Sequence, residues 1–514
     1  MTPAGHPTHG WPLSDPDSVD RLGDDLRVAG FDADGVPALL GPGAHHALGR
    51  GHRWPALHAT RDGSPLATLI RLFLLGTTEP ESAVAAALPT TGLDRAVAAG
   101  AIERDGDGIR AGLDIRPHAD DASQFLVVSD LDSDTRLGPV RPNHVLGIGS
   151  ASITLARAVI REPVGSTLDL GTGCGIQALH CFSHSGSVTA TDTNPRALAL
   201  AAATARLNDQ HWDLRAGSLF EPVADERFDL VVSNPPFVIG PGVQHFEYRD
   251  SGLAGDELCR RLIAEVPAHL MDGGTAQLLA NWLVRDRADW RERIGAWVAG
   301  TGCDAWVVQR EIADPAEYVS LWLADSGESG TAGAEQTAAQ WLDWFAAERV
   351  VGIGMGSVTL RNSGASDPDI VLDELTAAGD EITGPEAAAF LARRNWLRDK
   401  HDDDLLATRF SLAPGDLLHT RALPGHQGWT TVLRMLQRPG GPGATLQLDE
   451  WGQALLGGCR GDVPLVLQIQ ILAAAHDLDE NALAAAVLPA VRVAVARGLL
   501  HPVAAEPGSS ALTG

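Results

Sequence analysis

Three groups of residues in this chain have the types and spacing of a ligand site. The first is a glycine-rich turn, Asp169-Leu170-Gly171-Thr172-Gly173-Cys174-Gly175, directly after a short apolar run. Glycines let the backbone approach a ligand closely, and a helix beginning at Ile176 would offer free N–H groups. The second group is Asp192. The third is the tetrapeptide Asn234-Pro235-Pro236-Phe237.

Each group follows a predicted strand, so all three are expected at one edge of a sheet. In an open α/β sheet, ligands bind beyond the carboxyl ends of the strands. A carboxylate at the position of Asp192 can accept hydrogen bonds from both hydroxyls of a ribose. The two adjacent prolines, Pro235 and Pro236, end their strand and present a rigid polar and aromatic tip. The three groups therefore predict one nucleotide-type site.

The glycine turn departs from two common nucleotide loops. A dinucleotide-binding turn, Gly-x-Gly-x-x-Gly, would need glycine at position 176, where Ile176 stands. A Walker phosphate loop would need Lys-Ser or Lys-Thr after the glycines, and neither dipeptide follows here. A glycine turn alone is weak support for any function. The order of turn, acidic residue and Asn-Pro-Pro-Phe makes the prediction specific.

The elements that must position these groups alternate between strands and helices, which indicates a parallel sheet. Helices are predicted around 176–183, 195–207 and 256–270. A Gly-, Ser- and Ala-rich loop is expected from 325 to 337, and 364–379 is expected to leave the domain. Seven strands are predicted, at 166–170, 187–192, 214–216, 228–233, 275–281, 305–310 and 350–361.

A mainly helical module is expected on each side of this α/β core. In the first, helices at 65–75, 79–88 and 93–100 precede a hairpin at 101–110, an order similar to a winged helix. The C-terminal end repeats apolar segments of this module at 464–472, 482–489 and 495–500; either a true repeat or chance similarity in an alanine-rich chain accounts for them. Neither module has the basic recognition helix of a DNA reader. The predicted domains are 1–125, 126–362 and 363–514.

From about residue 140 to residue 361, the chain resembles the class I S-adenosylmethionine-dependent methyltransferases. It is most similar to the branch that carries an Asn/Asp-Pro-Pro-aromatic motif. That branch includes HemK-like protein-glutamine N5-methyltransferases, which act on release factors, and the N6-adenine and N2-guanine methyltransferases of DNA and RNA. The resemblance implies an α/β fold with a seven-stranded, Rossmann-like core and S-adenosylmethionine as cofactor.

The resemblance also implies roles for individual residues. The Asn234 side-chain carbonyl and the Pro235 backbone carbonyl would accept the two N–H bonds of a planar amide or amine, beside Pro236. Phe237 would stack on that group. Ser218 stands where the family often has an acidic residue before Leu-Phe, which leaves its adenine contact open. The implied cofactor-binding residues are Asp169, Gly171, Thr172, Gly173, Gly175, Asp192, Ser218, Leu219 and Asn234.

Charge bears on the choice of methyl acceptor. The formal net charge is −27 and the pI is about 4.9, whereas a nucleic-acid binder normally carries a basic face. A protein substrate similar to a release factor, methylated on a glutamine, is therefore the preferred prediction. RNA or DNA is the alternative, served by a local patch of Arg285, Arg287, Arg291 and Arg293. A cofactor-binding protein without activity is a third reading.

Location and three smaller features complete the predictions. Five scattered cysteines, no visible signal peptide and no membrane-spanning apolar run indicate a cytoplasmic protein with no membrane partner. No metal is predicted: His180 and His184, with Cys181 between them, hint at one, but a helix surface explains them better. The segment 247–250 is either a substrate lid or a solvated loop. Residues 143–149, including His144, either cover the cofactor or do not contact it.

Overall fold

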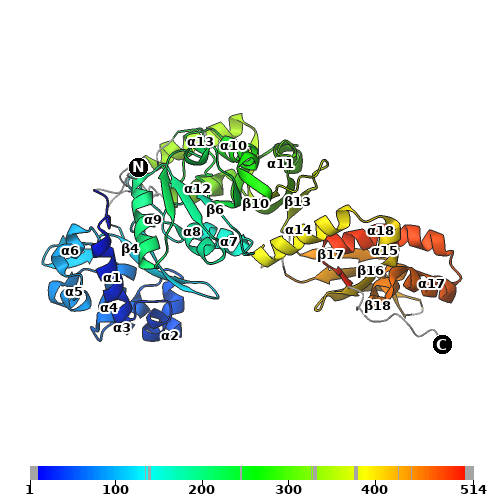
Figure 1. The fold of residues 1–514 in the computed structure, drawn as a ribbon, viewed down its shortest axis with the longest axis horizontal. Coiled ribbons are helices and arrows are strands. Elements are labelled where there is room, and N and C mark those ends of the chain that lie inside the picture. The colour runs from blue at the N-terminus through cyan, green and yellow to red at the C-terminus, as the bar shows by residue number, and fades with distance from the viewer. Residues whose placement is uncertain are drawn as a thin grey trace. The chain divides into compact units, whose positions relative to one another are not determined.

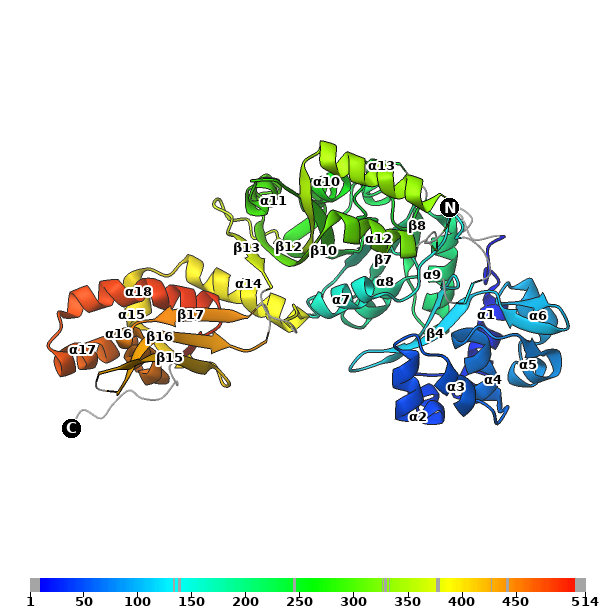
Figure 2. The same ribbon diagram turned by 180° about the vertical axis from the view of Figure 1, so that it is seen from behind.

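The computed structural model describes residues 10–503, apart from 133–134, 137–139, 244–245, 326, 328–330, 332, 376–379, 427 and 441–442. The chain forms two compact units, traced in Figures 1 and 2. Unit 1 holds residues 1–157 and 161–372, and unit 2 holds residues 158–160 and 373–514. Among the described residues, no helix combines the length and the apolar character needed to cross a membrane. All five cysteines are buried and unpaired.

The centre of unit 1 is a mixed sheet in the order β13-β11-β12-β10-β9-β6-β7-β8. Strands β8, β7, β6, β9 and β10 run parallel, and β12 lies antiparallel between β10 and β11. All seven predicted strands are present: β6 (Thr167–Leu170), β7 (Val188–Asp192), β8 (Asp213–Ala216), β9 (Phe228–Ser233), β10 (Leu270–Arg285), β11 (Asp304–Ala313) and β12 (Val350–Arg361).

The predicted number of seven strands is one too low. An eighth strand, β13 (Ile370–Glu374), extends the edge of the sheet beside β11, within the segment predicted to leave the domain. It is held there by Ala305 N–H, which donates to Asp369 O at 2.9 Å, and by Asp369 N–H, which donates to Asp304 Oδ1 at 2.9 Å. β13 has one partner strand and is mostly half-buried, and its apolar run, Ile370-Val371-Leu372, is only three residues long before Asp373 and Glu374.

Helices cover this sheet. Helices α8 (Ile176–Cys181) and α9 (Pro195–Leu207) contact β6, β7 and β8, whereas α10 (Glu257–Glu265) and α11 (Trp290–Ala299) contact β10. Two further helices, α12 (Pro315–Asp325) and α13 (Ala334–Ala347), contact β12. The predicted loop at 325–337 lies between them; it is shorter than predicted, and part of it lies outside the described residues. Helix α7 is Ser150–Ala158.

The N-terminal part of unit 1 has the predicted helices and hairpin. The helix expected at 65–75 is α4 (Pro65–Leu69) continued by a π-helical turn, Ile70–Leu74. Strand β1 (Glu79–Pro80) pairs with β3, which makes a third strand beside the hairpin. The remaining elements are α1 (Pro16–Ala29), α2 (Gly35–Leu48), α3 (Trp54–Ala59), α5 (Glu81–Ala87), α6 (Leu93–Ala98), β2 (Ile102–Asp105) and β3 (Gly108–Ala111).

A second hairpin, β4 (Asp114–Ala119) and β5 (Gln124–Ser129), joins this part to the sheet domain. β4 contacts the π-helical turn and β5 contacts α9, where Val128 N–H donates to Thr204 Oγ1 at 3.1 Å. The domain boundary expected after residue 125 therefore falls inside β5. One apolar core runs from the N-terminal helices into α8 and α9, which explains why both parts form one unit.

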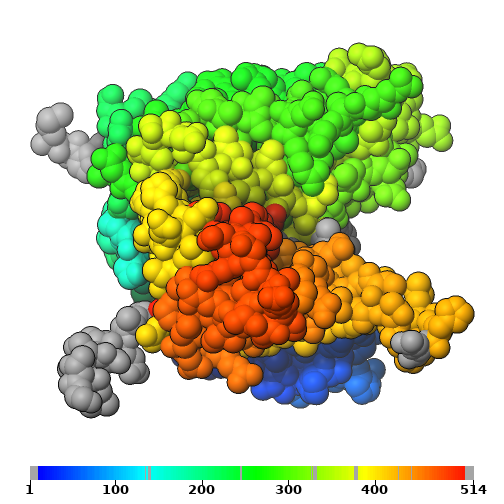
Figure 3. All heavy atoms as spheres, turned by 90° about the vertical axis from the view of Figure 1, so that its right-hand side faces the viewer, coloured from blue at the N-terminus to red at the C-terminus, as the bar shows by residue number. Residues whose placement is uncertain are grey.

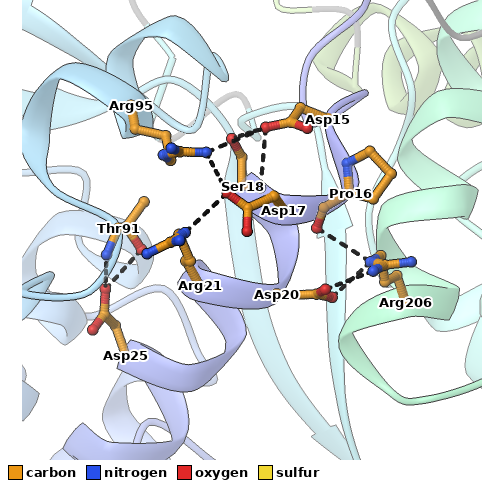
Figure 4. A network of polar contacts seen from close by, with 10 residues as sticks. All are labelled: Asp15, Pro16, Asp17, Ser18, Asp20, Arg21, Asp25, Thr91, Arg95 and Arg206. Atoms are coloured by element: carbon orange, nitrogen blue, oxygen red, sulfur yellow. Dashed lines mark hydrogen bonds and ion pairs between the residues drawn. The ribbon is translucent and has the colours of Figure 1, made fainter.

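Polar contacts reinforce the same junction around α1 (Figure 4). Arg206, in the last turn of α9, binds Asp20 of α1 through two hydrogen bonds of 2.6 and 2.5 Å. Arg95 of α6 pairs with Asp17 at 2.6 Å. Buried Asp25 accepts hydrogen bonds from the N–H and the hydroxyl of Thr91, at 2.8 and 2.7 Å. Helix α1 is thus tied to both α6 and α9.

Unit 2 contains more strand than predicted. Six strands form two three-stranded sheets, β18-β14-β19 and β15-β16-β17. The strands are β14 (Arg409–Leu412), β15 (Leu417–Gly425), β16 (Gly428–Arg438), β17 (Ala444–Leu448), β18 (Arg460–Pro464) and β19 (Leu500–Val503). The helices are α14 (Gly384–Arg398), α15 (Asp402–Ala407), α16 (Glu450–Gly458), α17 (Leu465–His476) and α18 (Glu480–Ala496).

Of the two explanations for the similar C-terminal segments, a true repeat or chance similarity, the structure favours chance similarity at their centre. The segments at 482–489 and 495–500 were expected to match two helices, but α18 runs unbroken through Pro489 to Ala496. In the N-terminal part, Gly92 has a φ of 72° and separates α5 from α6. The corresponding stretch of α18, Ala490-Val491-Arg492, has no glycine, so the helix resumes after its proline.

Candidate active site

Strand register brings the three predicted groups to one edge of the sheet. Leu170 at the end of β6 lies opposite Thr191 of β7 and opposite Ser233 of β9. The next residues along these three strands are Gly171, Asp192 and Asn234. The Ser233 hydroxyl donates to Leu170 O at 2.7 Å and ties the ends of β6 and β9 together. The carboxyl ends of β6, β7 and β9 therefore place these residues side by side.

The glycine turn needs glycine for two different reasons. Gly171, Gly173 and Gly175 have φ values of 75°, 57° and 89°, a region that residues with a Cβ rarely adopt. A Cβ on Gly175 would lie 2.5 Å from the Trp212 ring, so this glycine is required by packing. A Cβ on Gly171 or Gly173 would meet no atom within 4 Å, which leaves open space beside the turn. That space is where a ligand would lie.

Asp169 holds the turn on the helix that follows. Its Oδ2 accepts hydrogen bonds from the Thr172 hydroxyl at 2.6 Å and from Ala178 N–H at 3.0 Å. The side chain is fully buried, and burial raises the pKa of the Asp169 carboxyl to about 6. Its Oδ1 is a buried atom without a hydrogen-bond partner among the described residues. Asp169 therefore fixes the turn, and one of its oxygens is left to accept a further donor.

Asp192 connects the turn to the start of α9. Its Oδ2 accepts the N–H of Gly173, and its Oδ1 accepts the N–H of Asn194, both at 2.9 Å. Burial raises the pKa of the Asp192 carboxyl, while its backbone hydrogen bonds lower it. Asn194 caps α9 by accepting the N–H of Arg196 at 2.9 Å, and its amide donates to Asn143 O at 3.0 Å. The sequence predicted the helix that begins at Pro195, but the link from Asn194 to residue 143 depends on the tertiary structure.

The motif after β9 carries an unused acceptor. Asn234 Oδ1 is buried and has no hydrogen-bond partner among the described residues. A buried carbonyl oxygen left unpaired costs about 1–3 kcal/mol, so its persistence at this edge is typical of a site completed by a ligand. Pro235 is buried, and the half-buried Phe237 packs against the core of the sheet domain.

The end of β8 lies beside Asp192 as well. Ala216 pairs with Asp192, and Gly217 N–H donates to Asp192 O at 3.1 Å. Ser218 is exposed, and Leu219 has a φ of 48°, an uncommon conformation for a residue with a Cβ. Strain of this kind, of the order of 1–3 kcal/mol, persists where the surrounding structure imposes it. All the predicted site residues therefore lie within the last two residues of β6 and β7 or just after the ends of β6, β8 and β9.

Two segments that the sequence left undecided meet near this edge. Glu247 N–H donates to Pro142 O at 2.9 Å, and the ring of Tyr248 contacts the ring of His144 edge-on, with centroids 5.7 Å apart. Burial and the nearby Asp192 carboxylate raise the pKa of the Glu247 carboxyl. The Tyr248 hydroxyl donates to Asp325 at 2.8 Å. The segment 246–250 is thus packed against residues 142–144, close to Asp192.

A buried ion pair supports the segment that contains His144 and Val145. Arg196 of α9 binds Asp130 through its Nε at 3.0 Å and through a terminal nitrogen. Asp130 Oδ2 also accepts the N–H of Val145 at 2.9 Å and lies 3.6 Å from His144 Nδ1. Burial lowers the pKa of the His144 imidazole. No pattern in the sequence pointed to this pair.

Two predicted surface features have a different character in the structure. The four arginines expected to form a basic patch each lie within ion-pair distance of a carboxylate: Arg285 with Glu348, Arg287 with Asp286, Arg291 with Asp289, and Arg293 with Asp256.

His180 is buried, not on a helix surface; its Nε2 lies 2.9 Å from His118 Nε2. In the part of the chain that the structure describes, no cluster of three or more metal-binding side chains is present.

The strand order, with β12 reversed between β10 and β11 and a glycine turn after β6, defines a class I methyltransferase fold. Residues 146–289 match the family model described as the methyltransferase small domain, which confirms the predicted resemblance for this segment. The flanking residues 28–112 and 388–502 match two families described only as domains of unknown function.

Curated relatives match about a quarter of the chain. A release factor glutamine methyltransferase from Geobacter sulfurreducens is 32% identical over 26% of this chain and 52% of its own length. A ribosomal protein uL3 glutamine methyltransferase from Bradyrhizobium diazoefficiens is 33% identical over 27% and 47%. A ribosomal RNA small subunit methyltransferase C from Alcanivorax borkumensis is 31% identical over 23% and 32%. The chain spans about half the length of the first two relatives.

Proposed function

We propose that the domain around β6 to β12 is an S-adenosylmethionine-dependent N-methyltransferase that acts on a planar amide or amine nitrogen. The observation that carries this proposal is the buried, unpartnered Asn234 Oδ1, beside the open glycine turn and Asp192. An amide N–H of an acceptor substrate would satisfy that oxygen. Asn234 would then select for a nitrogen that still carries a hydrogen to donate.

The residues at the edge fit the cofactor. Asp192 has carboxylate lone pairs left for ribose hydroxyls after it accepts Gly173 and Asn194 N–H. The open space at Gly171 and Gly173 accommodates a chain passing close to the backbone, supported by Asp169 and Thr172. Ser218 and Leu219 would border the base. Bound S-adenosylmethionine supplies a methyl group on a positively charged sulfonium.

The chain's own residues would prepare the acceptor nitrogen. An amide or ring amine is planar because its lone pair is delocalised, which makes it a poor nucleophile. Hydrogen bonds to the Asn234 side-chain carbonyl and the Pro235 backbone carbonyl would orient its two N–H bonds, while Phe237 packs on its plane. Holding two reactants in a productive geometry is worth roughly 7–11 kcal/mol in favourable cases. No strong general base is needed to abstract a proton before transfer.

For the acceptor we favour a protein glutamine side chain. Two of the relatives reported above are named as glutamine methyltransferases, of a release factor and of a ribosomal protein. The net charge of −27 disfavours a polyanionic substrate, and the arginines of the expected basic patch have carboxylate partners. Unpaired cysteines agree with a cytoplasmic protein. An exocyclic amine of RNA is the second candidate, favoured by the similarity to a ribosomal RNA methyltransferase.

A transfer assay tests the proposal. The purified chain is incubated with methyl-labelled S-adenosylmethionine and cell extract, and the labelled products are divided by protease or nuclease treatment. Protease-sensitive label, carried by a release factor and identified as N5-methylglutamine, is expected. Asn234→Ala should leave cofactor binding nearly intact and lose at least about 100-fold in turnover, because its side-chain carbonyl is the acceptor contact that the reaction needs. Cofactor binding without transfer to any extract component would indicate a binding protein without activity.

Salt dependence separates the two acceptor classes. Affinity for a release factor is expected to change little between low and physiological salt. If RNA is the acceptor, log affinity falls with log salt by about 0.7–0.9 per phosphate contact. Steeply salt-dependent binding of ribosomal RNA, with no methylation of any release factor, would replace the protein acceptor and leave the methyltransferase assignment intact.

A further inference from the structure

Unit 2 carries a hairpin that is exposed to an unusual degree. β15 is the outer strand of the sheet β15-β16-β17, and all nine of its residues except the half-buried Ala422 are exposed. Figure 3 shows this hairpin as the gold and orange arm projecting from the body of the unit. Large apolar side chains are exposed along it: Trp429 by 76%, Leu423 by 59%, Val432 by 55%, Leu417 by 50% and Leu418 by 45%.

The hairpin also differs from the rest of the chain in charge. Residues 417–438 contain three arginines and no Asp, Glu or Lys, within a chain of net charge −27. Arg438 is paired with Glu386 at 2.9 Å. In the described part of the chain, neither Arg421 nor Arg434 has a carboxylate within ion-pair distance. Protein–protein interfaces are enriched in Trp and Arg and depleted of Lys, Glu and Asp, and the hairpin has this composition.

A free strand edge of this kind is ready to pair with another chain. Natural proteins protect edge strands with charged side chains, bulges or covering elements, because the unpaired N–H and C=O groups recruit other strands. β15 has a single charged side chain, Arg421, and the irregularity in its pairing with β16 adds the extra residue, Val432, to β16. From Leu417 to Leu423, before Pro424 removes an N–H, β15 therefore keeps a regular backbone suited to accept a further strand.

We propose that β15 binds an extended, acidic segment of a partner protein as an added antiparallel or parallel strand. Leu417, His419, Arg421 and Leu423 alternate along β15 and share one face. On that face the partner would place a carboxylate opposite Arg421 and apolar residues opposite Leu417 and Leu423. This inference concerns unit 2 alone and does not depend on the methyltransferase proposal.

Charge and composition decide between the possible occupants. A second copy of the chain pairing through its own β15 would bring two cationic hairpins together, which like-charge repulsion disfavours. A nucleic acid would require several cations for its phosphates, and only Arg421 and Arg434 are available against five exposed apolar side chains. An acidic protein segment satisfies both the arginines and the apolar surface.

Hydrogen exchange of the full chain tests this assignment. The probes are a peptide of about ten alternating valine and glutamate residues, its lysine counterpart, and a uridine oligonucleotide of similar length. The glutamate peptide is expected to slow amide exchange in 417–425 by roughly tenfold or more, since strand pairing protects backbone N–H groups. The lysine peptide and the oligonucleotide are expected to leave it unchanged.

Variants distinguish strand pairing from non-specific binding to exposed apolar side chains. Leu423→Asp should abolish the protection, whereas Ile471→Asp on α17, at the same exposure of 59%, should not affect it. Arg421→Glu should transfer the preference from the glutamate peptide to the lysine peptide. Protection by the oligonucleotide, protection that grows with protein concentration alone, or no protection by either peptide would each overturn the proposal.

Discussion

The amide N–H of Gly173 donates to Asp192 Oδ2 at 2.9 Å, across the gap between the turn after β6 and the end of β7. This contact gives Asp192 two tasks. It holds the glycine turn in its left-handed conformation, and it presents the remaining carboxylate lone pairs at the edge where we place the cofactor. A substitution at this position should therefore affect both the turn and the ligand.

Asp192→Ala is expected to weaken S-adenosylmethionine binding 10- to 100-fold, as hydrogen bonds to a charged group contribute roughly 1.5–3 kcal/mol. It should also lower the thermal unfolding temperature, because Gly173 and Asn194 N–H lose their acceptor. Titration calorimetry and thermal unfolding measure the two effects. Asp225→Ala, which changes an exposed carboxylate away from this edge, is the control. Unchanged cofactor affinity would remove Asp192 from the site.

Two glycines of the turn should respond differently to alanine. Gly171→Ala places a methyl group in open space, so the cost is the positive φ, about 1–2 kcal/mol, together with weaker cofactor binding. Gly175→Ala adds a clash with Trp212 to the same strain, and overpacking costs a further 1–3 kcal/mol or so. Urea unfolding compares the two variants. Trp212→Leu should recover part of the loss in Gly175→Ala and none of the loss in Gly171→Ala.

The buried Arg196–Asp130 pair should be more costly to break than to replace. Arg196→Met leaves the Asp130 carboxylate buried without its partner, which is expected to cost about 3–5 kcal/mol. The double variant Arg196→Met with Asp130→Asn removes that charge but keeps an acceptor for Val145 N–H, so it should recover part of the loss. Arg260→Met, in a pair whose side chains are 47% and 44% exposed, should change stability by less than about 1 kcal/mol. Chemical denaturation with tryptophan fluorescence measures all three; equal losses in the single and double variants would contradict the prediction.

Acid should destabilise the fold through the paired imidazoles of His118 and His180. Burial, with a smaller contribution from His118, lowers the pKa of His180 from 6.5 to about 4. Between these values the unfolded chain binds more protons than the folded chain, so stability falls as pH drops from 6.5 toward 4. The slope is at most about 1.4 kcal/mol per pH unit for one proton.

Two buried carboxyls act in the opposite direction over part of this range. Burial raises the pKa of Asp114 and of Asp169 to about 6, so each favours the folded state as pH falls from 6 toward its ordinary value of 3.8. The contribution of His180 is therefore measured as a difference. The unfolding free energy of the parent chain minus that of His180→Gln should fall as pH drops from 6.5 to 4.5; parallel curves would show that His180 does not titrate in this window.

The sequence identified the central domain because its signals are local. A buried parallel strand such as β6 or β9 is a short apolar run, and each run ends in residues that forbid its continuation, Gly171 or Pro235. Strand β13 and the hairpin β15–β16 were missed because neither is a buried apolar run. The segments at 482–489 and 495–500 were compared with separate elements of the N-terminal module, but one helix, α18, spans Pro489, because residues on both sides of the proline pack in the same core.

The sequence by itself determined which residues form the candidate site, because residue type and position at the end of a strand are both written in the chain. Tertiary structure alone decided how these residues act together. Strand register sets Gly171, Asp192 and Asn234 side by side, and the approach of separate segments pairs Gly173 with Asp192 and Asn194 with residue 143. The tertiary structure also leaves Asn234 Oδ1 without a hydrogen-bond partner among the described residues. Whether a buried polar atom is satisfied depends on every neighbour around it, and those neighbours come from distant parts of the sequence.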